Sequence, residues 1–392
     1  MTTKDAIAVQ EAVVRAWSTL GLTGAKAPMI SFPRAAWREL GSAGCLGLSF
    51  PTDVGGQGAS LATVAATAAA LARGGAPLGL VLAWLMNEML GHYAIARLAS
   101  AEQRASLLPA MARGELLCAL SISEPGAGAN PKLLGTRAER VHEGWRLNGR
   151  KAFVSNGPNA DLFIVIAISA EAAGRKAFSA YLVPGDAPGL VRQTHDKPVA
   201  GLAPLGHCGL ELADCTIGPD KLLGVEGSAF PDFARPFRDV EDALLPGILV
   251  GAMARMLASA VANASALEPT RQLECGVLLT RLAALAQVAR GAADELAAQG
   301  VGERLKAINT GFKELAGDWL ARWQQVVGQA CDPPSDGPGS GAAASSEQAM
   351  LTQDVNILIN IARGVGRTRQ QSLGAVVAGD KALDEVALRT SF

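Results

Sequence analysis

Residues 121–130, SISEPGAGAN, gather hydroxyls, a carboxylate and two glycines in ten positions. The preceding residues, GELLCAL, have the composition of a β-strand, so we expect a loop at the end of that strand. A glycine-rich turn can bring backbone N–H groups close to a phosphate, and serine hydroxyls can donate to a ligand. The alternative is an ordinary turn in which Ser123 bonds its own backbone.

A second candidate for chemistry is a single carboxylate. Glu241 lies at helical spacing with three apolar residues, Leu245, Ile248 and Ala252. Desolvation on such a face raises the pKa of a carboxyl group towards neutrality, which suits a general base. The alternative is a boundary glutamate paired with Arg238 or Arg235 one turn earlier.

Three zones of composition must position these candidates. Residues 1–117 have the helical period, whereas residues 118–228 form short β-rich runs separated by Gly, Pro, Asn and Asp. The helical period returns in residues 229–392, interrupted at about 332–348 by a stretch rich in Pro, Gly and Ser that is typical of a surface loop. We therefore expect an α+β fold with an N-terminal helical domain, a central β-domain and a C-terminal four-helix bundle.

Composition narrows the classes of function. A net charge of −1 over 392 residues gives no electrostatic reason to bind nucleic acid or an anionic membrane. No apolar run reaches the roughly 18 to 20 residues of a membrane span, so we expect no span. The six cysteines have no metal-binding spacing, and the expectation is a soluble cytoplasmic protein with reduced thiols.

Four segments, in order, give the chain a likeness to a known family. They are WRELGSAGCLGLSFPTDVGGQG, AEQRASLLPAMARGELLCALSISEPGAGAN, WRLNGRKAFVSNGPNADLFIVIA and LGHCGLELADCTIGPDKLLGVEGSAF. Over about residues 30–255 the chain resembles the acyl-CoA dehydrogenase superfamily of flavoproteins. The resemblance implies FAD-dependent α,β-dehydrogenation of an acyl-CoA or acyl-carrier thioester, with electrons leaving through an electron-transfer flavoprotein.

The resemblance also implies roles for particular residues. Ser123 falls where the family has a hydroxyl that bonds the flavin ring, Ser155 where a hydroxyl meets flavin N5, and Phe153 where an aromatic ring packs on the flavin. Leu120 and Ile122 would line the same wall. Backbone N–H groups of residues 126–129, including Gly128, would face the FAD pyrophosphate.

The chain departs from the family pattern on the phosphate side and in its last third. Ala129 and Asn130 replace a serine and an aspartate. The Arg-x-x-Phe-Gly and Gln…Gly-Gly-x-Gly segments that reach the FAD of a neighbouring subunit are absent, and Arg271 is the only cation near the first.

The position of the usual catalytic glutamate also differs. Ala362 or Arg363 occupies it here. A minority of the family instead uses a glutamate ten residues before a glycine, and Glu241 and Gly251 have that spacing.

Four functions remain open. The chain could be a dehydrogenase by itself, with Glu241 as base, or one subunit of a heteromeric α2β2 dehydrogenase, a class that includes enzymes of steroid-CoA side chains. It could also be a catalytically inactive paralogue that serves as a structural partner, or a flavin monooxygenase on the same fold. A homotetramer would lack the cross-subunit FAD contacts at every site, whereas a related partner chain could supply them. The departures therefore favour the heteromer.

Overall fold

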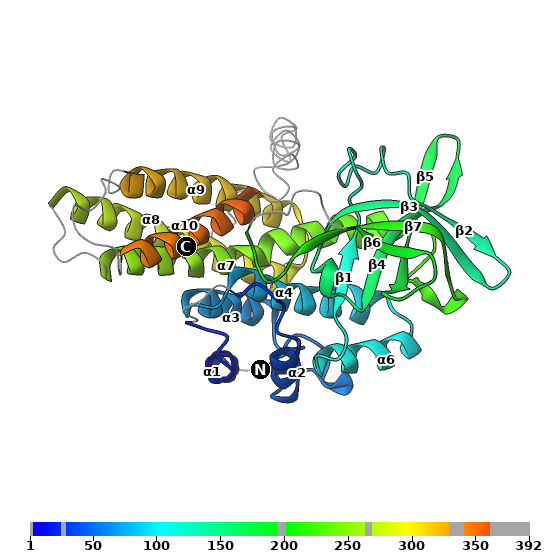
Figure 1. Ribbon diagram of the computed structural model, residues 1–392, viewed down its shortest axis with the longest axis horizontal. Coiled ribbons are helices and arrows are strands. Elements are labelled where there is room, and N and C mark those ends of the chain that lie inside the picture. The colour runs from blue at the N-terminus through cyan, green and yellow to red at the C-terminus, as the bar shows by residue number, and fades with distance from the viewer. Residues whose placement is uncertain (1–2, 25–28, 194–200, 263–268, 329–340, 361–392) are drawn as a thin grey trace. The chain divides into compact units, whose positions relative to one another are not determined.

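The computed structural model describes residues 3–24, 29–193, 201–262, 269–328 and 341–360 (Figure 1). The chain divides into two compact units. The first contains Met1–Ala59 and Gly79–Arg238, and the second contains Ser60–Leu78 and Asp239–Phe392. The order of helices, central sheet and helices confirms the expected α+β class.

The N-terminal helices begin and end where local signals predict. Ser60 caps α3 by accepting the N–H of Thr63, and α3 ends at Arg73, immediately before Gly74 and Gly75. Ser100 and Gln103 form a reciprocal capping box at the start of α6. The helices of this part of the chain are α1 (Thr3–Thr19), α2 (Arg34–Ser42), η1 (Thr52–Val54), α3 (Leu61–Arg73), α4 (Leu78–Met89), η2 (Leu90–Ile95), α5 (Ala96–Leu98) and α6 (Ala101–Ala112).

The first unit contains a single eight-stranded sheet (Figure 1). Its strand order is β6-β7-β3-β2-β4-β5-β8, with β1 paired in parallel to β4. β2 is largely exposed and polar and therefore lacks the apolar pattern from which a strand is recognised. The strands are β1 (Cys118–Ser121), β2 (Arg137–Val141), β3 (Gly144–Ser155), β4 (Leu162–Ala172), β5 (Arg175–Pro184), β6 (Leu190–Gln193), β7 (His207–Ile217) and β8 (Leu222–Leu223).

Apolar side chains from one face of these strands form the core of the sheet. Phe163, Val165 and Ala167 alternate along β4 and are fully buried. Trp145 and Tyr181 meet edge to face with ring centroids 5.1 Å apart. Three short 3-10 or π-helical turns follow strands of the sheet. η3 (Gly157–Asn159) connects β3 to β4, η4 (Pro219–Lys221) connects β7 to β8, and η5 (Phe230–Ala234) leads into the C-terminal helices.

The second unit consists of α3 and the C-terminal helices. These are α7 (Arg235–Ala262), whose first residues belong to the first unit, α8 (Pro269–Gln299), α9 (Glu303–Gly328) and α10 (Gly341–Asn360). α8 and α9 lie side by side (Figure 1). A loop was expected at about residues 332–348. Residues 332–340 lie outside the described residues. Residues 341–348 are helical and belong to α10, so the expectation is wrong for them.

Two helical stretches of the described residues, Leu78–Leu98 and Phe230–Ala262, are long and apolar enough to cross a membrane by length and composition alone. Neither stretch is the unbroken apolar run that the expectation concerned; leucine, valine and alanine residues with few charges raise the mean hydropathy of stretches that polar residues interrupt. The buried shares of the two apolar windows are 94% and 61%. Buried core helices pass the same test, so this is weak evidence for a membrane.

Candidate functional site

Leu120 and Ile122 lie at the end of β1. Along Cys118–Ser121 and the residue that follows, Ala119 and Ser121 are buried, whereas Leu120 and Ile122 are half-buried. Alternation along a strand places Leu120 and Ile122 on the same, outward face. Ser123 follows at once and is also half-buried.

A β-bulge in β3 turns Phe153 outwards. Lys151 pairs with Leu210 and Val154 pairs with Cys208, so three steps along β3 face two steps along β7. Phe153 lies in this bulge with a left-handed φ of 55° and is 62% exposed. A bulky residue at positive φ is strained, and such strain persists only where the surroundings fix it.

Main-chain hydrogen bonds bring the two segments together. The N–H of Ala152 donates to the carbonyl of Ser123 at 2.8 Å, which joins the residue before Phe153 to the loop. Ser155 stands two residues beyond Phe153, paired with His207 on β7. We call the group Leu120, Ile122, Ser123, Phe153 and Ser155 the ligand edge.

A buried ion pair lies directly behind the ligand edge. The ammonium of Lys151 is 0% exposed, and it donates to the carbonyl of Ile122 at 3.0 Å and to Glu124 Oε1 at 2.9 Å. Glu124 also accepts the N–H groups of Gly135 at 2.7 Å and Thr136 at 3.0 Å. The pair therefore fixes both ends of the segment between residues 122 and 136.

Burial and pairing oppose each other in this ion pair. Desolvation lowers the pKa of Lys151 from its ordinary 10.5 to about 8, although the charge of Glu124 and its hydrogen bond act to raise it. Burial would raise the pKa of Glu124, but the Lys151 ammonium and hydrogen bonds from Thr136, Lys151 and Gly135 outweigh it and hold that pKa below its usual value. Both groups are charged at neutral pH.

The glycine-rich part of the loop is more open. Gly126 and Gly128 have φ of 72° and 56°, and a Cβ at either position would meet no atom within 4 Å. The N–H groups of Ala127 and Gly128 donate to the carbonyl of Glu124 at 3.2 and 3.0 Å. These two donors are thus engaged inside the loop, although the backbone around them leaves room for a ligand.

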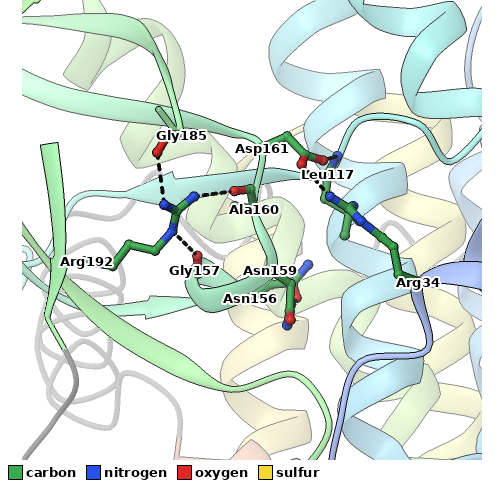
Figure 2. A network of polar contacts seen from close by, with 9 residues as sticks. All are labelled: Arg34, Leu117, Asn156, Gly157, Asn159, Ala160, Asp161, Gly185 and Arg192. Atoms are coloured by element: carbon green, nitrogen blue, oxygen red, sulfur yellow. Dashed lines mark hydrogen bonds and ion pairs between the residues drawn. The ribbon is translucent and has the colours of Figure 1, made fainter. Parts of the chain in front are cut away.

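The turn that follows Ser155 is held from several directions (Figure 2). Asn156 adopts φ of 58° and donates its N–H to the carbonyl of Gly206 at 3.0 Å. At the far end, Asp161 accepts the N–H of Leu117 at 2.8 Å and an ion pair from Arg34. We call residues 156–161 the 156–161 turn.

Glu241 belongs to the second unit, on α7. At 100° per residue, it shares one helix face with the three apolar residues expected from the sequence, Leu245, Ile248 and Ala252. All three are fully buried, and Glu241 itself is half-buried. The apolar stripe on which its proposed chemistry depends is therefore present.

Two other faces of α7 are fixed by packing within the second unit. A Cβ at Gly247 or Gly251 would approach the carbonyl oxygens of Ala65 or Ala69 on α3 to 2.4 or 2.2 Å, so both positions require glycine. On a further face, the buried carboxylate of Asp242 pairs with Lys313 of α9 at 2.7 Å. These contacts set the rotation of α7 and hence the direction of Glu241.

Comparison with known proteins identifies the family. Residues 22–115 match the N-terminal domain of the acyl-CoA dehydrogenases, and residues 119–215 match their middle domain. The chain belongs to the acyl-CoA dehydrogenase superfamily. The superfamily is FAD-dependent, and FAD-bound members are among the solved structures with a similar fold.

Three known proteins illustrate the likeness. The chain is 32% identical to the L-prolyl-[peptidyl-carrier protein] dehydrogenase of Pseudomonas fluorescens over 59% of its own length and 61% of that protein. It is 30% identical to the human mitochondrial short-chain specific acyl-CoA dehydrogenase over 51% and 48% of the two chains. The butyryl-CoA dehydrogenase of Megasphaera elsdenii has a similar fold, with a TM-score of 0.81, 20% identity and coverage of 96% and 99%. The chain thus matches about half to three-fifths of the length of these curated relatives.

The residues of the ligand edge fit the ring part of FAD. An exposed aromatic ring held at strained φ, two hydroxyls and two half-buried apolar side chains are the groups that a flat, partly polar ring system needs. On the phosphate side, Ala129 has no hydroxyl and the Ala127 and Gly128 amides are engaged in the loop. The fit is therefore good for the ring and incomplete for the pyrophosphate.

Sequence reasoning did not single out Glu124 or Lys151. The available signal was the spacing of Lys151, which stands four residues after Leu147 and so on the same side of a strand; both are buried in β3. A lysine buried in a sheet requires a partner, and the carboxylate next to Ser123 was a candidate in the sequence.

Proposed function

We propose that the chain takes part in FAD-dependent α,β-dehydrogenation of an acyl thioester, carried by CoA or by a carrier protein, as one subunit of a heteromeric α2β2 dehydrogenase. The observation that carries the proposal is the ligand edge. One main-chain hydrogen bond at 2.8 Å, from the N–H of Ala152 to the carbonyl of Ser123, joins the two sequence motifs that contain its hydroxyls and its outward aromatic ring. Membership of the family supplies the reaction class.

In this proposal each residue has a defined task. Ser123 and Ser155 hold the polar edge of the flavin, and Phe153 packs on the ring. Glu241 removes the α-proton of the thioester as general base, and its apolar helix face suits a carboxylate of raised basicity. FAD supplies acceptance of the β-hydride.

The heteromer is supported by what the chain lacks. The arginine and glycine-rich segments that lend contacts to a neighbouring FAD are missing from the sequence, and Ala129 removes a phosphate hydroxyl. α8 also exposes Leu273 and Leu279, apolar surface that a partner subunit would cover. We propose a related acyl-CoA dehydrogenase chain as the partner, an electron-transfer flavoprotein as the electron acceptor, and the cytoplasm as the location.

Co-purification tests the proposal. The chain is purified alone and together with a related chain that carries Arg-x-x-Phe-Gly, and the flavin spectrum and turnover are recorded. The substrates are short-chain acyl-CoA, a prolyl-carrier protein suggested by the Pseudomonas relative, and a steroid-CoA side-chain thioester. We expect a yellow, active complex and a weakly coloured lone chain. A lone chain that is yellow and active contradicts the heteromer, and a colourless complex contradicts the enzyme.

A substitution tests the base separately. Glu241→Gln should abolish turnover in the competent complex while FAD stays bound, because the amide keeps the shape and loses the proton acceptor. Glu303→Gln, an exposed carboxylate in the same unit that pairs with Lys306 at 2.7 Å, is the matched control and should leave turnover unchanged. An unchanged rate in Glu241→Gln would show that the base is another residue. Rapid reaction with oxygen and an added hydroxyl would instead indicate a monooxygenase.

A further inference from the structure

Arg192, on β6, makes an unusual set of contacts with the main chain. Its guanidinium donates to the carbonyls of Gly157 at 3.3 Å, Gly185 at 2.9 Å and Ala160 at 2.7 Å (Figure 2). It also lies over the ring of Phe163, with 5.2 Å from the guanidinium carbon to the ring centroid. A planar guanidinium places its donors on three separate nitrogens and so can hold three carbonyls that lie apart, whereas the three donors of a lysine all leave one nitrogen.

Two of those carbonyls belong to the 156–161 turn, which begins directly after Ser155. The third, on Gly185, lies just past the end of β5, and the N–H of Gly185 returns to the carbonyl of Asp161 at 2.7 Å. The guanidinium therefore closes a ring of contacts around the turn. Because Asn156 takes a left-handed φ of 58°, the turn leaves the strand sharply and its position depends on such contacts.

We infer that Arg192 is a positioning residue for the ligand edge. By holding the carbonyls of Gly157, Ala160 and Gly185, it fixes the 156–161 turn and thereby the position of the Ser155 hydroxyl. This role rests on the proposed function in one respect, since it takes the ligand edge to be where the flavin ring binds. Arg192 itself touches neither flavin nor substrate, and it acts through the turn.

The role differs from a general contribution to stability. β6 is held to β7 by its own backbone pairing, from Leu190 with Leu212 to Gln193 with Gly209. Removal of the guanidinium leaves that ladder in place. The turn also keeps its contacts with Gly206 and Leu117. The expected consequence is a displaced or looser turn on an intact sheet.

Arg192→Met tests the inference, because it keeps an unbranched stem of similar length over Phe163 and removes all the donors. Arg192→Lys retains the charge with one nitrogen. Arg150→Met is the matched control, since Arg150 is an exposed arginine on β3, which lies on the other side of β7 from β6, and its guanidinium bonds Glu211 at 3.4 Å. Each variant is prepared as the full chain, in whichever form of the wild type is yellow, and amide exchange is also measured without FAD.

For Arg192→Met, we expect FAD affinity to fall on the order of tenfold, the size of one hydrogen bond to the flavin that is lost when the Ser155 hydroxyl is displaced. The visible spectrum and reduction potential of the bound flavin should shift, and amide exchange in the 156–161 turn should accelerate even without FAD. Arg192→Lys should fall between wild type and Arg192→Met, and Arg150→Met should match wild type.

Other outcomes would overturn the inference in distinguishable ways. Faster exchange with an unchanged flavin spectrum, potential and affinity would mean that Arg192 is only structural. Unchanged exchange would mean that it does not hold the turn. A wild type that binds no FAD in any form refutes the proposed function instead. The exchange measurement then decides only whether Arg192 holds the 156–161 turn. If Arg192→Met does not fold, Arg192→Lys provides the same comparison.

Discussion

The buried pair of Lys151 and Glu124 makes a prediction about stability and pH. Burial lowers the pKa of Lys151 from 10.5 to about 8 in the folded chain. Between these two values the unfolded chain binds more protons than the folded one, so the free energy of unfolding rises with pH. One pKa unit corresponds to about 1.4 kcal/mol, so the gain is on the order of 3 kcal/mol. It is absent below about pH 8 and complete near 10.5.

Lys151→Met removes that titration. Near neutral pH the variant loses two hydrogen bonds from the ammonium and leaves the largely buried Glu124 carboxylate without its cation, so it should be less stable than the wild type. As the pH rises from about 8 to about 10, the wild type should gain stability relative to the variant, because only the wild type has the Lys151 ammonium, which loses its buried charge in this range. Urea unfolding of both proteins across this range measures the difference.

The matched control is Lys176→Met. The ammonium of Lys176 likewise makes two hydrogen bonds, here to the main-chain carbonyls of Lys132 at 3.0 Å and Leu134 at 2.8 Å. Lys176→Met therefore shows how much of any change in stability with pH follows merely from losing a lysine in this region. A difference between wild type and Lys151→Met that stays constant, or that shrinks as the pH rises, would refute the reasoning.

Three further predictions follow from packing and burial. Gly251→Ala should lower the free energy of unfolding by about 1–3 kcal/mol, because a Cβ would stand 2.2 Å from the carbonyl oxygen of Ala69; an unchanged urea midpoint would contradict it. Burial raises the pKa of the Cys118 thiol to about 12, so iodoacetamide at neutral pH should label half-buried Cys275 well before Cys118, as peptide mass spectrometry can measure. In the competent complex, Glu241→Gln should remove turnover and retain the flavin spectrum; a variant that loses both would point to a structural role.

The sequence predicted the parts of the fold that depend on local periodicity. The break at residues 73–77 separates α3 from α4, and the β-rich runs became β3, β4, β5, β6 and β7. β2 escaped prediction because its exposed, polar side chains leave no apolar pattern. The two membrane-length helices gave no such signal in the sequence, because polar residues interrupt their apolar runs although leucine, valine and alanine keep the mean hydropathy high.

The candidate site was predictable in its residues but not in its geometry. Motif order pointed to Ser123, Phe153 and Ser155, and the structure brings their segments together. Regular alternation would place Lys151 and Phe153 on the same side of β3, yet the first is buried and the second is exposed. The bulge that separates them depends on a register shift against β7, and no pattern within β3 alone specifies it. Arg192 has no signal in the sequence because its three partners are main-chain carbonyls.

The hydrogen bonds on either side of the ligand edge hold a strained stretch of backbone. Phe153 and Asn156 both adopt left-handed φ, and they flank Val154 and Ser155. Strained residues of this kind persist only where the surroundings leave no easier alternative. Here the strained stretch lies between a buried ammonium, which holds the neighbouring loop, and an arginine, which holds the turn beyond it. A surface that needs two cations bonded to main-chain carbonyls to keep it in place costs stability to maintain, and a ligand that requires this edge is the simplest reason for the chain to keep it.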